Sequence, residues 1–290
     1  PTMGGILFIV GSIVATAAGY VVYRMTSSVD VTAISGNREA LRVMSCVIFC
    51  LLFGIIGFID DFAYVAKKQN EGLTPKQKLA LQVVAAILWL AAMYWLGDRS
   101  TAIDLVFVRF DIRWFYYPVM VLVILYLTNA VNLTDGVDGL CGTVTLVAML
   151  IFTLICSRLQ MTSYTLFTMA LAGGCLGFLV WNLHPAKCFM GDTGSMFLGA
   201  AVASVGLATH QHLVLILVAL VYILEALSVM IQVTYFKYTK KKYGEGRRIF
   251  KMTPIHHHFE MSGFSEYKIV ITFSLFGLIA GAVGLLLVTL

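Results

Sequence analysis

The stretch NLTDGVDGL, residues 132–140, lies between two apolar runs and decides how the rest of the sequence is interpreted. The runs on either side, 116–132 and 138–156, are each long enough as helices to cross the roughly 30 Å of hydrocarbon in a bilayer. Asp135 and Asp138 are three residues apart, and a glycine follows each. Because a carboxylate near hydrocarbon is costly, acids in this position indicate a function or a specific partner.

The composition of the whole chain is that of an integral membrane protein. Hydrophobic residues make up 60% of the 290 residues and charged residues 12%, whereas about a quarter of a soluble domain is charged. We therefore expect an all-α integral membrane protein, a polytopic helical bundle with nine transmembrane helices. The predicted spans are 4–24, 41–60, 79–97, 116–132, 138–156, 164–182, 194–209, 212–236 and 268–290.

The remaining global features add no second domain. No internal repeat or low-complexity linker divides the chain, so residues 1–290 are expected to form a single membrane domain. The six cysteines show no spacing typical of disulfide frameworks or thiolate metal sites, and most lie in apolar runs. Since the sequence starts at Pro1 without a signal sequence, we expect it to begin within a longer product.

The distribution of basic residues predicts the orientation. If the spans alternate, the connections at 61–78, 133–137, 183–193 and 237–268 lie on one side and carry 13 lysines and arginines. The connections on the other side carry 7. The positive-inside rule makes the first side cytoplasmic, and the net charge of +5 reflects this asymmetry rather than a nucleic-acid partner.

Five polar clusters, which were not used for this assignment, all lie at the ends predicted to be cytoplasmic. They consist of carboxylates, amides, histidines and glycines, the groups expected in a phosphate and metal site. The clusters are PTMGG (1–5), GFIDDF (57–62), NAVNLTDGVDGL (129–140), WNLHPAKCFMGDTGS (181–195) and TPIHHHFE (253–260).

Asp60 and Asp61 end an apolar run, where solvated charges at the headgroups are the simplest explanation. Adjacent side chains on a helix diverge by about 100°. One carboxylate can therefore face a cavity while the other contacts a lysine or water. This geometry suits a catalytic base beside an orienting partner.

The cluster around Asp135 holds more polar groups than a helix cap needs. Asn129 and Asn132 are about one helical turn apart at the end of a predicted span, and Asp135 and Asp138 follow at the start of the next. One acid can cap that helix. The neighbouring glycines allow a ligand to approach the backbone closely, and the helix N-terminus offers amide donors.

Asp192 lies in FMGDTGS, between Gly191 and Thr193 and directly before a predicted helix. It could be an N-cap, but Mg²⁺ also binds through one or two carboxylates together with substrate phosphates and water. Phe189, just upstream, is a packing aromatic or a surface on which a nucleobase stacks.

The histidines and lysines have alternative readings. His256, His257 and His258 are consecutive, which is not the i, i+4 spacing of a helical zinc site, so contacts with phosphate are favoured over zinc. The lysines at 67, 68, 76 and 78 fit roles in topology or lipid contact. Glu225 lies within a predicted span and is expected to face protein or a cavity.

Taken in order, PTMGG, GFIDDF, NLTDGVDGL, FMGDTGS and PIHHHFE resemble the motifs of the polyprenyl-phosphate N-acetylhexosamine-1-phosphate transferases, over the full length of the chain. PTMGG and PIHHHFE resemble the phospho-N-acetylmuramoyl-pentapeptide transferase branch. The resemblance implies a ten-helix inner-membrane enzyme with its active site on the cytoplasmic face. Such an enzyme needs Mg²⁺ and transfers phospho-MurNAc-pentapeptide from UDP-MurNAc-pentapeptide to undecaprenyl phosphate, giving lipid I and UMP in peptidoglycan synthesis. A homodimer and inhibition by nucleoside natural products are implied likewise.

The resemblance also implies roles for individual residues. It places Mg²⁺ on Asp192 and makes Asp60 the base or nucleophile, with Asp61 beside it. The residues implied to support phosphate and metal are Asn129, Asn132 and Asp135, and those implied to hold uridine are Gly136, Val137, Asp138, Asn182 and Phe189. Lys76, His256, His257 and His258 are implied to meet the pyrophosphate or sugar.

This sequence departs from the family pattern at two places. A first helix and a lysine upstream of PTMGG are not in the sequence. Tyr64 stands where relatives often carry a lysine, and the nearby Lys67 or Lys68 could take the role of that lysine. Two other functions remain open. A sister enzyme that uses UDP-GlcNAc would lack PIHHHFE, and a secondary transporter would place its acids near the bilayer midplane.

Overall fold

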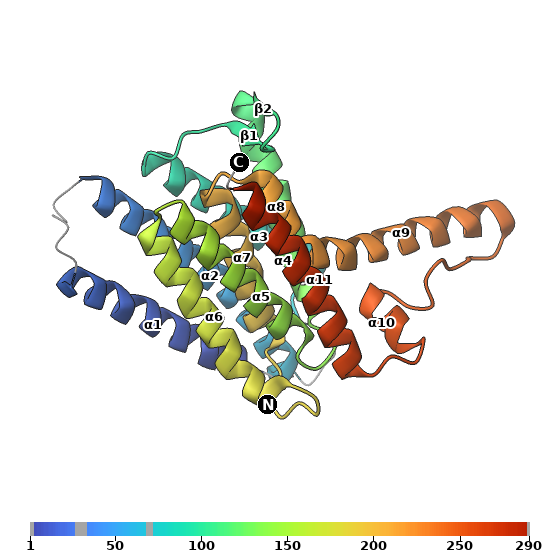
Figure 1. The fold of residues 1–290 in the computed structure, drawn as a ribbon. Coiled ribbons are helices and arrows are strands. Elements are labelled where there is room, and N and C mark those ends of the chain that lie inside the picture. Colours follow the sequence, from blue (N-terminus) through green and yellow to red (C-terminus); the bar gives the residue numbers. More distant parts are fainter. Residues whose placement is uncertain (1–2, 27–33, 68–71, 289–290) are drawn as a thin grey trace.

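The computed structural model describes residues 3–26, 34–67 and 72–288, which form a bundle of helices with one short two-stranded ribbon (Figure 1). The elements are α1 (Gly5–Thr26), α2 (Ile34–Lys67), α3 (Pro75–Trp95), β1 (Ala102–Asp104), β2 (Arg109–Asp111), a 3-10 turn (Arg113–Phe115), α4 (Tyr116–Thr134), α5 (Leu140–Arg158), α6 (Thr162–Asn182), α7 (Gly191–Ala208), α8 (His212–Val218), α9 (Leu220–Tyr243), α10 (Ile255–Glu260) and α11 (Glu266–Leu287). The strands are antiparallel, with Ala102 opposite Asp111.

The all-α, multi-pass membrane architecture predicted from the sequence is confirmed, but the count of nine spans is wrong by one. In the described part of the chain, eight helices are long and apolar enough to cross a membrane: α1, α2, α3, α4, α5, α6, α9 and α11. The predicted span 194–209 corresponds to α7, which does not have the composition of a lipid-facing helix. The predicted span 212–236 is divided between α8 and α9, with a break at Ala219.

Helix α7 is enclosed by the rest of the bundle. Every residue from Thr193 to Ala208 is buried, and α7 packs chiefly against α2 and α4. A helix buried on all sides contacts protein rather than lipid, so small side chains replace large apolar ones. This burial explains why glycine, alanine and serine are frequent along α7 and make it less apolar.

Glycines allow the neighbouring helices to approach α7 closely. A Cβ on Gly199 would lie 2.7 Å from the Thr128 Cα of α4, and a Cβ on Gly5 of α1 would lie 2.6 Å from the Gly194 Cα. A Cβ on Gly57 of α2 would overlap the backbone of Asp192. Small residues at such contacts permit backbones to pack tightly in a membrane bundle. The start of α7 is therefore fixed against both α1 and α2.

Polar contacts join neighbouring segments at both ends of the bundle. At one end, the N–H of Asp192 at the start of α7 bonds to Asp61 near the end of α2. At the other end, His210 just after α7 pairs with Asp98 after α3 at 2.8 Å. Helix α9 projects from the bundle, and α10 lies beneath it (Figure 1).

We expect Gly199→Ala to lower the free energy of unfolding by about 1–3 kcal/mol, because the added methyl group overlaps the backbone of α4. Gly173→Ala on α6 is the matched control. It also replaces a helical glycine by alanine, but the added Cβ meets no atom within 4 Å. Thermal unfolding of the two purified variants in detergent measures the difference. Equal melting temperatures would contradict the close packing of α7.

Candidate active site

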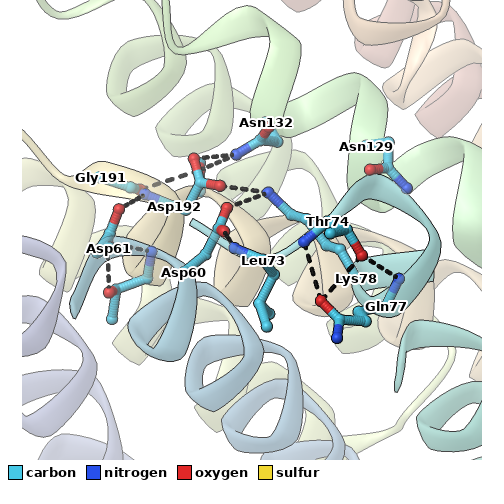
Figure 2. Close-up of polar contacts among 12 residues, drawn as sticks. Asp60, Asp61, Leu73, Thr74, Gln77, Lys78, Asn129, Asn132, Gly191 and Asp192 are labelled. Carbon is cyan, nitrogen blue, oxygen red and sulfur yellow. Dashed lines mark hydrogen bonds and ion pairs between the residues drawn. The ribbon is translucent and has the colours of Figure 1, made fainter. Parts of the chain in front are cut away.

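Three helices bring charged side chains together at the start of α7. Asp60 comes from the end of α2, Asp192 from the first turn of α7, and Lys78 from the first turn of α3 (Figure 2). The Lys78 Nζ lies 3.0 Å from the Asp60 Oδ2 and also pairs with the Asp192 Oδ2. Lys78 thus joins the two predicted catalytic carboxylates.

Both carboxylates have further partners that orient them. The Asp60 Oδ1 accepts a hydrogen bond from the Leu73 N–H at 2.6 Å. The Asn132 amide donates to the Asp192 Oδ1 at 2.9 Å and to the Ser195 hydroxyl at 2.8 Å. Asn132 therefore contacts the predicted metal ligand directly. The side chains of Asp60 and Asp192 remain 18% and 29% exposed, so both carboxylates are accessible to small ligands.

Asp61 points to a different partner from Asp60. Its Oδ1 accepts the Asp192 N–H at 3.1 Å, and its Oδ2 accepts the Thr193 N–H at 2.9 Å and the Thr193 hydroxyl at 2.6 Å. Free N–H groups at the start of a helix favour a carboxylate. Asp61 therefore caps α7 from α2 and positions Asp192, while Asp60 faces Lys78.

Lys78, rather than the predicted Lys76, is the lysine that pairs with the acids. Thr74 and Gln77 form a capping box that fixes the start of α3. Lys76 is exposed and makes no hydrogen bond or ion pair with the described residues, whereas Lys78 points toward the acids. The sequence feature that could have indicated Lys78 is Gln82, a polar residue one turn later on the same face of an otherwise apolar helix.

Asn129 lies on the same side of the bundle but does not contact Asp192. Its side-chain amide donates to the Gln82 Oε1 at 2.8 Å and to the Leu125 carbonyl at 2.7 Å. Because Gln82 is buried, this pair satisfies two polar side chains between α3 and α4. Asn129 thus joins the two helices that carry Lys78 and Asn132.

The connection between α4 and α5 carries the residues predicted to hold uridine. Asp138 is held by the Ala186 N–H, which donates to its Oδ2 at 2.9 Å. The Asn182 Oδ1 accepts the Gly139 N–H at 3.2 Å, and Asn182 itself is buried. Val137 is buried, whereas Phe189 is 48% exposed. The structure therefore gathers Asp138, Asn182 and the segment up to Phe189, with Phe189 as the accessible aromatic surface.

The three histidines face different surroundings. His256 is fully buried, and its Nδ1 lies 3.0 Å from the Glu225 Oε2. A Cβ on Gly136 would overlap the His256 Nε2, so the imidazole packs directly on the α4–α5 connection. His257 pairs with Glu260 at 2.8 Å, and the His258 Nδ1 accepts the Lys251 N–H at 3.1 Å. The rings of His256 and His257 lie with centroids 4.2 Å apart, whereas the His258 ring packs against Phe250. His256 supports the loop from behind.

Asp135 has a strongly perturbed acidity. Burial, together with the nearby charges of Asp192, Asp61 and Asp138, raises the pKa of Asp135 to about 7. Like charges in a poorly solvated place disfavour another ionised carboxyl group. The site therefore has an excess of acidic groups, to which added positive charge would bind favourably.

The donor set at Asp192 fits Mg²⁺. Asp60 and Asp192 already share one cation, the ammonium group of Lys78, and both offer carboxylate oxygens of the kind that a hard cation prefers. Their partial exposure leaves room for water and phosphate oxygens. Lys68 and the side chain of Lys67 lie outside the described residues.

Comparisons with known proteins show the family of this chain. Residues 43–210 match the model of glycosyl transferase family 4. The chain is 41% identical to a protein of Shouchella clausii over 98% of this chain and 82% of that relative. It is 42% identical to a protein of Carboxydothermus hydrogenoformans over 96% of this chain and 82% of that relative. It is also 37% identical to a protein of Listeria welshimeri over 99% of this chain and 84% of that relative.

All three relatives are phospho-N-acetylmuramoyl-pentapeptide-transferases. The family match covers Asp60, Lys78, Asn132 and Asp192, the residues that form the charged cluster. Since the similarity extends over nearly the whole chain, this membrane protein belongs to the phospho-N-acetylmuramoyl-pentapeptide transferases of glycosyl transferase family 4.

Proposed function

We propose that this chain transfers phospho-MurNAc-pentapeptide from UDP-MurNAc-pentapeptide to undecaprenyl phosphate, giving lipid I and UMP, with Mg²⁺ held at Asp192. The observation that carries the proposal is the pairing of Lys78 with both Asp60 and Asp192 at one end of the bundle. A site at that end lets a lipid phosphate arrive from the membrane and a nucleotide from water. The basic loops at the same end support a position at the cytoplasmic face of the bacterial inner membrane.

The reaction is a phosphoryl transfer. An oxygen of the lipid phosphate forms a bond to the sugar-linked phosphorus, the bond from that phosphorus to the bridging oxygen breaks, and UMP leaves with the electron pair. Positioning and charge stabilisation supply most of the catalysis in such reactions. Mg²⁺, when bound, supplies positive charge to the phosphoryl oxygens.

The chain's own residues have distinct tasks in this proposal. Asp60 is held by Leu73 and Lys78 and serves as the base for the lipid phosphate or as the nucleophile of a two-step route. Asp61 and Asn132 fix Asp192 from opposite sides. Lys78 contributes a permanent positive charge beside both acids.

The nucleotide is assigned to the α4–α5 connection. Asp135 supports the phosphate and metal region, and Asp138 with Phe189 contacts the uridine. Gly136 and Val137 shape this loop, which is supported from behind by Asn182 and His256. His257 and His258 are assigned to the sugar or pyrophosphate, and the family resemblance adds a homodimer and sensitivity to nucleoside inhibitors.

Two other functions are less well supported. A transferase for UDP-GlcNAc would use the same charged cluster, but the relatives named above are all muramoyl-pentapeptide transferases. A secondary transporter would use ionisable groups near the bilayer midplane, whereas Asp60, Lys78 and Asp192 gather at helix ends.

The first experiment measures UMP release by the purified protein with undecaprenyl phosphate and Mg²⁺, in parallel reactions with UDP-MurNAc-pentapeptide and UDP-GlcNAc. Turnover of the muramoyl substrate is expected, with a loss of at least roughly a hundredfold in Asp192→Asn, since the charge that holds the cation is removed. Turnover of UDP-GlcNAc alone would identify the sister enzyme. Turnover of neither substrate would favour the alternative function, a secondary transporter.

A pair of lysine variants separates the structural assignment from the one based on resemblance. Lys78→Met is expected to reduce kcat by roughly a hundredfold, because it removes the charge shared by Asp60 and Asp192. Lys76→Met makes the same change on an exposed side chain, and we expect a loss smaller than about tenfold in the same UMP-release assay. The reverse order would restore Lys76 as the principal basic residue.

The raised pKa of Asp135 predicts a pH dependence of stability. Between about pH 4 and pH 7 the folded protein holds a proton on Asp135 that the unfolded chain has released, so stability falls as the pH rises through this window. Without divalent cations, the melting temperature in detergent should decline from pH 5 to pH 7.5, and Asp135→Asn should make the decline shallower. An unchanged slope in the variant would show that Asp135 is not the group responsible.

A further inference from the structure

Asp138 of the predicted uridine site belongs to a cluster of three titratable side chains, and the other two have no part in the mechanism above. The cluster consists of Asp138 from the α4–α5 connection, His184 from the α6–α7 connection and Glu266 at the start of α11. The His184 Nδ1 lies 3.2 Å from the Asp138 Oδ2 and 3.1 Å from the Glu266 Oε1. The cluster joins segments that are far apart in the sequence.

Glu266 uses both of its oxygens to hold Asp138. Its Oε2 accepts the Asp138 N–H at 3.1 Å, and its Oε1 faces the imidazole that contacts the Asp138 carboxylate. Glu266 therefore fixes the backbone of Asp138 directly and the side chain through His184. Two carboxylates facing one ring nitrogen require a proton on that nitrogen, so His184 acts as the donor between them.

The positions of His184 and Glu266 are themselves fixed. Ser265 caps α11 by accepting the Lys268 N–H, which places Glu266 at the first position of that helix. The Tyr267 hydroxyl donates to the His184 carbonyl, and the rings of the two residues meet edge to face with centroids 5.6 Å apart. The start of α11 thus supports the loop that carries His184.

This support leaves one side of Asp138 available. Its Oδ2 is occupied by Ala186 and His184, whereas no described residue donates to its Oδ1. The Asp138 side chain is 20% exposed, so a ligand can reach it. A carboxylate whose orientation is already fixed loses less entropy when it binds a ligand.

We propose that Glu266, acting directly and through His184, is a positioning residue that orients Asp138 toward the nucleotide and thereby sets the affinity for the UDP half of the substrate. This inference rests on the proposed function, because it assigns Asp138 to the uridine. A supporting partner of a ligand-binding side chain commonly contributes on the order of tenfold or more to binding.

Glu266→Gln is the most direct test, because the side chain keeps its shape while one of its two acceptor oxygens becomes an amide donor. In the purified full-length chain, KM for UDP-MurNAc-pentapeptide should rise roughly tenfold. We expect kcat within about twofold of the unsubstituted protein and no change in KM for undecaprenyl phosphate. Glu245→Gln is the matched control, since Glu245 is exposed and makes no hydrogen bond or ion pair with the described residues.

Variants of His184 provide a rescue test. His184→Leu removes the donor between the carboxylates and should raise the nucleotide KM as Glu266→Gln does. His184→Asn places an amide N–H near the position of Nδ1 and should restore much of the affinity. A lower kcat with both KM values unchanged, or an equal rise in both, would show that the cluster only maintains the fold and would overturn the proposal.

Calorimetric titration with UMP separates this inference from the proposed function. If the unsubstituted protein does not turn over UDP-MurNAc-pentapeptide, the proposed function fails. The inference is still supported if Glu266→Gln weakens UMP binding roughly tenfold relative to Glu245→Gln. It is overturned if the two variants bind UMP equally or if the unsubstituted protein does not bind UMP.

Discussion

The close packing of α7 against its neighbours is the constraint on which the active-site end depends. Gly57 and Gly199 allow the backbones of α2 and α4 to approach α7, and Asp61 caps the first turn of α7 from α2. Because Asp192 lies in that first turn, the same contacts that enclose the helix also fix the predicted metal ligand. Loss of this packing would move Asp192 relative to both Asp60 and Asn132.

The charge balance at this end supports the proposal of a bound cation. Asp60, Asp61, Asp135 and Asp192 come from three different segments, and Lys78 pairs with only two of them. Burial and the neighbouring acids raise the pKa of Asp135, which reflects the shortage of positive charge. A divalent cation and its phosphate ligands would neutralise the acids in a place where water does so poorly.

The loop proposed to bind the nucleotide is held by other helices than the charged cluster. This loop, residues 135–139, is supported by Asn182, by the His256–Glu225 pair and by Glu266, which belong to α6, α10, α9 and α11. The charged cluster, in contrast, is built from α2, α3, α4 and α7. The charged cluster and the proposed nucleotide loop are thus held by largely separate sets of helices, which meet at the α4–α5 connection.

The sequence by itself determined the membrane class, most of the spans and the motifs, because apolar runs of sufficient length and polar clusters at their ends are visible in the order of residues. It also placed Asp60, Asp61 and Asp192 at the same predicted end of the bundle, where Asp61 bonds to Asp192 and Lys78 pairs with Asp60 and Asp192. Only the tertiary structure decided that Lys78 rather than Lys76 meets the acids, that α7 is enclosed, and that Glu266 supports Asp138. These features depend on helix rotation and on contacts between segments distant in the chain, whereas composition and local spacing report only which residues are neighbours along one helix.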